Sequence, residues 1–413
     1  MNPSMTDPTR DAAFAILSAV VDRRRPLEDA LDALPAIDAR DRAAAHRLAA
    51  AVLRRTGTLD AVLEPFLKKA PPPPVQHILR LGAAGLLLLD TPPHAAVATA
   101  VAEARSRGLA PFAGLVNAVL RRVAAEGTAA LEGLDGPRLD TPSWLWASWG
   151  RDARAIAEAH QREAPLDLTP RAGAVPPEGA EVLPTGSWRL PPGAPVTELS
   201  GFGEGAFWVQ DAAAALPAQL LGARPGERVA DLCAAPGGKT AQLAASGADV
   251  VAVERDGARM ERLRANLDRL RLAARTIVAD AESWRPEAPL DAVLLDAPCS
   301  TTGTIRRHPD VLHLKRPRDL VHLTAMQDRL LAAAAAMLRP GGRLVYAVCS
   351  LQPEEGPQRA AAALARLPLR LDPIVLPALP EAVTLEGMLR TTPALWPERG
   401  GVDGFFAARL VRA

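Results

Sequence analysis

The chain has 413 residues, of which 48% are hydrophobic and 23% charged, a composition typical of a globular protein with two or three domains. Its formal net charge of +1 excludes a polycation that would bind nucleic acid through overall charge alone. The apolar run LGAAGLLLL is too short to cross a bilayer, and Asp7 and Asp11 stand where a secretory signal would be basic and then apolar. We therefore expect a cytoplasmic protein with no membrane partner.

The first part of the chain, from about residue 10 to 125, has the periodicity of helices. Apolar residues such as Ile16, Leu17 and Val20 recur at helical spacing, and turn signals separate the Ala- and Leu-rich segments. The prolines at 71–74 open another such segment, because proline is tolerated at the start of a helix. This part therefore predicts an all-α domain.

The composition shifts toward proline and glycine between about 140 and 205. One helix is expected over SWLWASWGRDARAIAEAHQ, residues 143–161, and the remainder predicts irregular chain or short strands. Tryptophans can stack on RNA bases, but we expect Trp144, Trp146 and Trp149 to pack against the helix of this linker.

From Phe207 onward, short apolar runs alternate with helical segments. The expected strands are VADL, VVAV, TIVA, AVLLD, RLVYAV and FFAARLV, and the expected helices are KTAQLAAS, ARMERLRANLDRL and LTAMQDRLLAAAAAML. This alternation predicts an α/β domain with a doubly wound, largely parallel sheet.

A glycine-rich turn follows the first strand of this sheet, in the segment DLCAAPGGKT. Gly237 and Gly238 allow a tight turn and a close approach of the backbone to a ligand. The turn has neither the GxGxxG spacing nor that of a Walker loop, which disfavours a nucleoside triphosphate. Glu254 and Asp280 follow the next two strands, where an acid can accept hydrogen bonds from ribose.

Either acid alone is equally compatible with a solvated strand end, but together with the loop they favour a bound adenosine across the carboxyl ends of the strands. The residues that we expect to line this cofactor site are Cys233, Ala234, Ala235, Pro236, Gly237, Gly238, Lys239, Glu254, Asp280 and Asp296.

The three cysteines, Cys233, Cys299 and Cys349, each stand just beyond an expected strand. An odd number in a chain without an export signal argues against a disulfide framework, and their spacing does not resemble a zinc site. In a parallel sheet all three would lie at one edge, beside the glycine-rich turn. We expect Cys233 to pack beneath the loop rather than to react.

The motifs DLCAAPGGKT, LLDAPCSTTGTIRRHPD, VYAVCSLQPEE and GGVDGFFAARL, in this order, resemble those of RNA cytosine-5 methyltransferases of the NOL1/NOP2/Sun family. The helical front, with HAAVATAVAEA and LVNAVLRRV, resembles the NusB-type domain of the bacterial RsmB/Fmu group, which methylates 16S ribosomal RNA. The resemblance implies a NusB-like RNA-binding domain at 1–135, a linker with a reduced RNA-binding subdomain at 136–205, and a Rossmann-like methyltransferase domain at 206–413.

The resemblance also implies S-adenosylmethionine as cofactor and a covalent mechanism. Carbon 5 of cytosine is a weak nucleophile until a thiolate adds to carbon 6, and a partner at ring nitrogen 3 must stabilise the developing charge. By resemblance Cys349 is the nucleophile and Cys299 assists breakdown of the adduct, although the residues themselves rank neither thiol first. Asp296 is placed to serve nitrogen 3, and Lys239 to favour a thiolate or orient Asp296.

A basic stretch follows the PCS motif and consists of Arg306, Arg307, Lys315, Arg316 and Arg318. Beside a catalytic loop it predicts contacts with RNA phosphates, and otherwise a solvated charged loop. The chain departs from its family at Val348, where a threonine is common, and in the segment from 166 to 206, which is short.

RNA, most simply 16S ribosomal RNA, is the expected partner of a monomeric enzyme. Methylation of transfer RNA would use the same chemistry. A non-catalytic RNA-binding or antitermination factor would account for the NusB-like front, but it would have no need of the cofactor loop or the two thiols.

Overall fold

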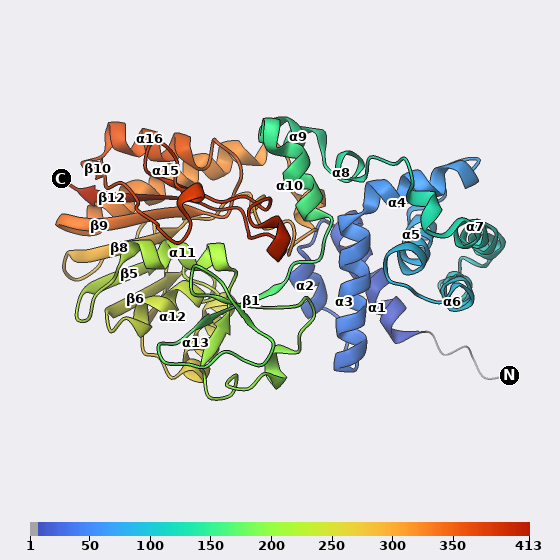
Figure 1. Ribbon diagram of the computed structural model, residues 1–413, viewed down its shortest axis with the longest axis horizontal. Coiled ribbons are helices and arrows are strands. Elements are labelled where there is room, and N and C mark those ends of the chain that lie inside the picture. Colours follow the sequence, from blue (N-terminus) through green and yellow to red (C-terminus); the bar gives the residue numbers. More distant parts are fainter. Residues whose placement is uncertain (1–6) are drawn as a thin grey trace. The chain divides into compact units, whose positions relative to one another are not determined.

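The computed structural model describes residues 7–413, which fall into two compact units (Figure 1). Unit 1 extends to Gln161 and also includes Ile305–Lys315. Unit 2 comprises Arg162–Thr304 and Arg316–Ala413. The compact units are bounded differently from the expected domains 1–135, 136–205 and 206–413, and that assignment of domains stays a prediction. Within residues 7–413, no helix combines the length and the apolar character that a membrane crossing requires.

Unit 1 is helical, as predicted. Its helices are α1 (Pro8–Leu17), α2 (Leu27–Asp32), α3 (Ala39–Arg54), α4 (Thr56–Leu63), α5 (Pro73–Leu88), α6 (Pro93–Ser106), α7 (Ala113–Glu126), α8 (Gly136–Leu139), α9 (Ser143–Trp149), α10 (Ala153–His160) and α14 (Val311–Leu314). Helix α1 starts where the Asp7 side chain accepts a hydrogen bond from the Arg10 N–H, and α5 starts on a proline. Ile16, Leu17 and Val20 are all buried in one apolar core.

The single helix expected over 143–161 is two helices, because the chain takes a left-handed conformation at Gly150 (φ +57°) and α9 ends there. Trp149 is buried and packs edge-on against His160 of α10, with 5.3 Å between ring centroids. The ring of Trp146 lies under the guanidinium groups of Arg138 and Arg154, at 5.4 and 5.7 Å. These two tryptophans therefore serve packing, as predicted.

The segment Ile305–Lys315 folds with the helices of unit 1. The Asp310 carboxylate accepts a hydrogen bond from the Leu27 N–H at 3.0 Å, and the Arg54 guanidinium donates to the Arg306 carbonyl at 3.0 Å. The Arg306 side chain is buried, so the expected contact with RNA phosphates is wrong at this residue, and so is the alternative of a solvated loop. Only tertiary packing of the segment against α3 and its neighbours removes that side chain from solvent.

A small antiparallel sheet opens unit 2, with the strand order β2-β3-β1-β4. Its strands are β1 (Leu166–Pro170), β2 (Glu181–Val182), β3 (Trp188–Leu190) and β4 (Phe207–Val209). A buried ion pair joins β1 to β3, since Arg189 donates to both oxygens of Asp167 at 2.6 and 2.7 Å. Leu168, Trp188 and Phe207 form its apolar side.

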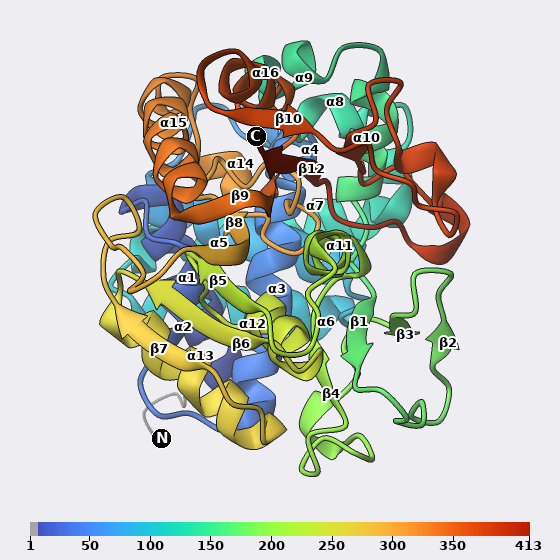
Figure 2. The same cartoon turned by 90° about the vertical axis from the view of Figure 1, so that its left-hand side faces the viewer.

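The larger sheet of unit 2 has the order β10-β12-β9-β8-β5-β6-β7, and β11 pairs with β12 (Figure 2). Its strands are β5 (Arg228–Leu232), β6 (Asp249–Glu254), β7 (Arg275–Val278), β8 (Leu290–Asp296), β9 (Leu338–Val348), β10 (Leu369–Leu371), β11 (Leu389–Arg390) and β12 (Phe406–Arg412). The five strands from β9 to β7 are parallel, and β12 is antiparallel to β9. The predicted α/β fold with a largely parallel sheet is confirmed.

Helices cover both faces of this sheet. They are α11 (Ala212–Leu221), α12 (Gly238–Ala245), α13 (Gly257–Leu270), α15 (Asp319–Met337) and α16 (Pro357–Arg366). Successive residues of a strand point to opposite faces, so Val251 belongs to the apolar cluster that contains residues of α15 and α16, whereas Val250 belongs to the one that contains residues of α11 and α12. The parallel strands are thus buried on both sides, and their carboxyl ends share one edge of the sheet.

Candidate active site

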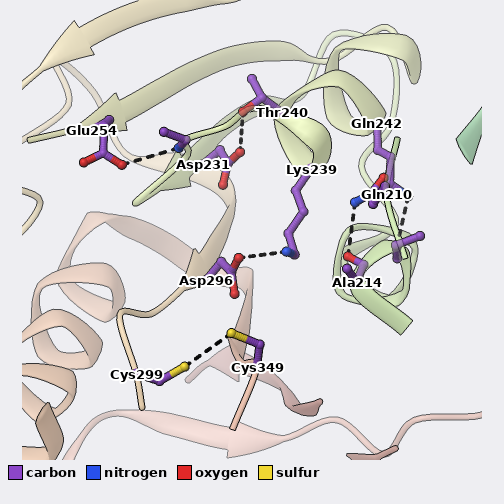
Figure 3. A network of polar contacts seen from close by, with 12 residues as sticks. Gln210, Ala214, Asp231, Lys239, Thr240, Gln242, Glu254, Asp296, Cys299 and Cys349 are labelled. Atoms are coloured by element: carbon purple, nitrogen blue, oxygen red, sulfur yellow. Dashed lines mark hydrogen bonds and ion pairs between the residues drawn. The ribbon is translucent and has the colours of Figure 1, made fainter. Parts of the chain in front are cut away.

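The carboxyl ends of neighbouring strands bring most of the expected site residues together. Cys233 follows β5, Glu254 ends β6, Asp296 ends β8 and Cys349 follows β9. Figure 3 shows the Lys239–Asp296 pair with the two thiols of Cys299 and Cys349 beside it. Strand order explains this arrangement, because β8 lies between β5 and β9 in the sheet.

The glycine-rich turn is held in one shape by its own backbone. Cys233 and Gly237 have left-handed conformations (φ +62° and +103°), and a Cβ at Gly237 would lie only 2.9 Å from Leu263 Cγ. The Ala234 N–H donates to the Val253 carbonyl at 3.1 Å, and the Arg259 guanidinium donates to the Ala235 carbonyl at 2.7 Å. The turn leads directly into α12, whose first backbone N–H groups can receive a ligand.

Asp231 and Thr240 fasten the two ends of this turn, a role that the sequence reasoning missed. Asp231 is fully buried, and its Oδ2 accepts a hydrogen bond from the Thr240 hydroxyl at 2.6 Å. Burial raises the pKa of Asp231 to about 7, although Thr240 and Lys239 oppose the rise. The sequence held one signal of this role, because Asp231 is a charged residue inside an otherwise apolar strand.

The two acids after β6 and β7 differ in their surroundings. Glu254 is buried and accepts hydrogen bonds from the backbone N–H groups of Ala235 (3.4 Å) and Asp256 (3.1 Å). Asp280 is exposed at the end of β7, and its Oδ1 accepts a hydrogen bond from the Glu282 N–H at 2.8 Å. A buried carboxylate beside a tight glycine turn fits the ribose hydroxyls and close approach that an adenosyl group requires.

Lys239 and Asp296 form an ion pair between the glycine-rich turn and the cysteines. The Lys239 Nζ donates to Asp296 Oδ2 at 2.7 Å, and the Phe405 ring centroid lies 5.2 Å from the same Nζ. Burial lowers the pKa of Lys239, but the charge and the hydrogen bond of Asp296 outweigh it, so the pKa is raised overall. A cation is therefore kept at this position.

Cys299 and Cys349 are adjacent. Their Sγ atoms are 3.5 Å apart, with Cys299 buried and Cys349 half-buried. The hydrogen bond with Cys349 and burial both raise the pKa of Cys299. Burial likewise raises the pKa of Cys233, which packs against the core of the sheet. Cys299 and Cys349, whose sulfurs are adjacent, are therefore the candidate reactive thiols, and Cys233 is not.

Comparisons with known proteins identify the family of this chain. A model described as 16S rRNA methyltransferase RsmB/F matches residues 218–411, and a model of the NusB family matches residues 7–125. The Ribosomal RNA small subunit methyltransferase B of Xanthomonas campestris is 38% identical over 435 aligned positions, covering 98% of this chain and 97% of that protein. The chain belongs to the RsmB/F family. The protein of the same name from Pseudomonas putida is 36% identical and covers 100% of this chain and 99% of its own length.

Solved structures show the same fold. The crystal structure of PH0851 matches 99% of this chain and 100% of its own, with a TM-score of 0.74 and 24% identity. A methyltransferase homolog protein from Pyrococcus horikoshii matches 68% of this chain and 96% of its own, with a TM-score of 0.55 and 25% identity. The chain is thus an RNA methyltransferase of the RsmB/F family, and its cofactor is S-adenosylmethionine.

Proposed function

We propose that the protein methylates carbon 5 of a cytosine in 16S ribosomal RNA through a covalent bond between Cys349 and the base. The observation that carries this proposal is the pair of thiols 3.5 Å apart, next to the Lys239–Asp296 ion pair and the cofactor loop. A methyltransferase that acts on a nucleophilic nitrogen or oxygen has no need of two adjacent thiols. Carbon 5 of cytosine does need one, because the ring must first be activated.

In the proposed reaction, the Cys349 thiolate adds to carbon 6 of the cytosine. A carbon–sulfur bond forms, the 5,6 double bond is lost, and its electron pair is delocalised between carbon 5 and nitrogen 3. Bound S-adenosylmethionine supplies an electrophilic methyl group for carbon 5. The half-buried position of Cys349 leaves its sulfur available to a base that enters the site.

Asp296 and Lys239 are the proposed partners of ring nitrogen 3. Lys239 donates to Asp296 Oδ2, so its ammonium group can supply a proton that the Asp296 carboxylate passes to the nitrogen. Lys239 is then neutral, and it recovers the proton when the ring is released. The contact stabilises the negative charge that thiolate addition places on the ring. The proposal also assigns cofactor contacts to Glu254, Asp280 and the loop from Cys233 to Lys239.

Cys299 is the proposed group for breakdown of the adduct. The proton on carbon 5 passes to a base at Cys299, the electron pair of that C–H bond restores the 5,6 double bond, and the bond between Cys349 and carbon 6 breaks. The Cys299 sulfur lies 3.5 Å from the sulfur that must leave.

The proposed RNA substrate follows from the names of the relatives, which act on the small ribosomal subunit. The NusB-like residues 1–135 are the proposed RNA-binding part, with 206–413 as the catalytic part. Arg316 and Arg318, which are exposed, suit contacts with phosphates. We further propose that the enzyme acts as a monomer in the cytoplasm.

A methyl-transfer assay tests the proposed function. The purified protein is incubated with methyl-labelled S-adenosylmethionine and 16S ribosomal RNA from a strain that lacks the gene, with transfer RNA from the same strain as the competing substrate. We expect label in 16S ribosomal RNA, recovered as 5-methylcytosine after digestion and mass spectrometry. Label in another nucleoside would overturn the chemistry, and label in transfer RNA alone would overturn the substrate.

The roles of the two cysteines are tested by trapping. C299A is expected to accumulate a protein–RNA adduct that survives denaturing electrophoresis, because addition to carbon 6 proceeds while breakdown is slow. C349A is expected to form none. Accumulation in C349A instead of C299A would exchange the two assignments.

A further inference from the structure

We propose that Glu355 is a positioning residue that ties the two cysteine loops together, an inference that rests on the proposed function of the two thiols. Glu355 is fully buried. Its Oε1 accepts hydrogen bonds from the Ser300 N–H at 2.8 Å and the Gln327 side chain at 3.1 Å. Its Oε2 accepts from the hydroxyls of Ser300 at 2.5 Å and Ser350 at 2.6 Å. One carboxylate thus receives four donors.

Two serines connect this carboxylate to the two cysteines. Ser300 directly follows Cys299, and Ser350 directly follows Cys349. Their hydroxyl oxygens are 3.0 Å apart, and both bond to the same oxygen of Glu355. A shift of either loop would therefore break a hydrogen bond to a buried charge, which is costly because no water replaces it.

Glu355 is itself held in place from two sides. The Tyr346 hydroxyl, on β9, donates to the Glu355 carbonyl at 2.5 Å. The Gln327 side chain, on α15, bonds to Glu355 and also to the Pro298 carbonyl at 2.9 Å, one residue before Cys299. Glu355 is therefore fixed through its backbone carbonyl to the strand that precedes Cys349, and through its carboxylate to the helix that contacts the loop of Cys299.

Arg390, on β11, contacts the loop that follows Cys349. Its guanidinium donates to the Leu351 carbonyl at 2.6 Å and to the Ser350 carbonyl at 3.3 Å. The chain between Cys349 and Glu355 is thereby fastened at its start as well as at its end. The Thr302 hydroxyl also lies 3.4 Å from the Ser300 hydroxyl and 3.3 Å from that of Ser350, but both serines make their shorter hydrogen bonds to Glu355. The spacing of the two sulfurs is therefore expected to depend chiefly on this carboxylate.

A carboxylate suits this position better than an amide. All four partners donate to Glu355, and glutamine would offer one acceptor oxygen while pointing an NH2 group at two of the donors. The serine hydroxyls can rotate to accept from that NH2 group, so E355Q retains part of the network. E355A removes all four hydrogen bonds and leaves the donors buried.

The spacing of the sulfurs can be measured without methyl transfer. Diamide oxidises two adjacent thiols to a disulfide, in which the sulfurs lose two electrons and two protons and diamide is reduced to its hydrazine. The rate at which a Cys299–Cys349 disulfide forms, followed by peptide mass spectrometry, reports how often the sulfurs meet. The full-length wild type, E355Q, E355A and the control E354Q are compared, with thermal unfolding recorded for each.

We expect disulfide formation to slow by about tenfold in E355A and less in E355Q, while E354Q behaves as the wild type. Methyl transfer should follow the same order, with kcat lowered by about a hundredfold in E355A and the KM for S-adenosylmethionine unchanged. If E355A fails to fold, E355Q carries the test. Disulfide formation and kcat within about twofold of wild type in the folded E355 variants would overturn the inference.

The test of Glu355 can fail or succeed independently of the test of the proposed function. If the wild type transfers no methyl group to cytosine but forms the disulfide at a rate that depends on Glu355, the positioning role stands and the proposed function falls. If methyl transfer occurs and neither rate depends on Glu355, the positioning role falls and the proposed function stands.

Discussion

Two buried glutamates, one in each compact unit, have opposite surroundings. Glu355 of unit 2 receives four hydrogen bonds. Glu103 of unit 1 is also buried, but its Oε1 accepts from Arg107 at 3.2 Å, and its Oε2 has no hydrogen-bond partner within the described chain. Burial raises the pKa of Glu103 to about 7, against the opposing charges of Arg107 and Arg10. Both carboxyl groups are buried, so the two sites differ in the number of hydrogen-bond donors rather than in burial.

The same contrast extends to other buried polar groups. His160 of unit 1 is buried, and neither ring nitrogen has a hydrogen-bond partner in the part of the chain that the structure describes. Burial, with Arg306 and Arg54, lowers its pKa to about 3. In unit 2 the buried groups at the strand ends fix the geometry of the residues that we propose to react. We therefore expect substitutions at the strand ends to act on activity, and those in the helical core to act on stability and its pH dependence.

The largest expected effect is that of C349A. Loss of the proposed nucleophile should reduce methyl transfer by at least about a thousandfold, because the ring can no longer be activated. The melting temperature should stay close to that of the wild type, since a half-buried thiol contributes little to packing. Label transfer and thermal unfolding measure the two. Methyl transfer by C349A would contradict the expectation that substitutions at the carboxyl ends of the strands act on activity.

D296N should have the next largest effect. An amide retains the size of the side chain but loses the charge that pairs with Lys239 and cannot pass a proton on, so ring nitrogen 3 loses its proposed proton donor. We expect kcat to fall by about a hundredfold while the affinity for S-adenosylmethionine changes little. Steady-state kinetics and calorimetric titration separate these quantities. A loss confined to cofactor affinity would instead assign Asp296 to the cofactor alone.

G237A tests the cofactor loop. The new Cβ would meet Leu263 Cγ at 2.9 Å in a backbone with φ +103°, so the turn must open. We expect about a tenfold loss of cofactor affinity, together with a stability cost of about 1 kcal/mol. The control is G226A, where φ is +78° but no atom lies within 4 Å of the added Cβ. G226A should lose stability and keep cofactor affinity; equal losses of affinity in both variants would contradict a local effect.

E103Q should have the smallest effect, visible only as a pH dependence. The pKa of Glu103 is about 7 in the folded protein, whereas that of an unperturbed glutamate is 4.5, so its stabilising contribution is complete below about pH 4.5 and is lost as pH rises through 7. The melting temperature of the wild type should therefore fall more between pH 5 and pH 8 than that of E103Q. Methyl transfer should be unaffected. Parallel curves for the two proteins would show that Glu103 is not the titrating group.

The sequence by itself was sufficient for most helices and strands of the two units and for the motifs at their ends, although the helix expected over 143–161 is two helices. Short apolar runs, the glycine-rich turn and the cysteine motifs are local patterns, so the strands and the residues that follow them could be predicted. The parallel order of those strands then implied that Cys299 and Cys349, fifty residues apart, would lie at one edge, and their sulfurs are 3.5 Å apart.

Only the tertiary structure decided which polar groups are buried and with what partners. Glu355 meets Ser300 across fifty-five residues, and Asp310 meets Leu27 across 283. Arg306 was expected to contact RNA phosphates or, as the alternative, to be solvated, and it is buried in unit 1. No local pattern carries such information, because a hydrogen bond between distant segments depends on which strands and helices become neighbours. The sequence alone therefore indicated the two thiols, and the tertiary structure added the carboxylate that we infer holds their loops together.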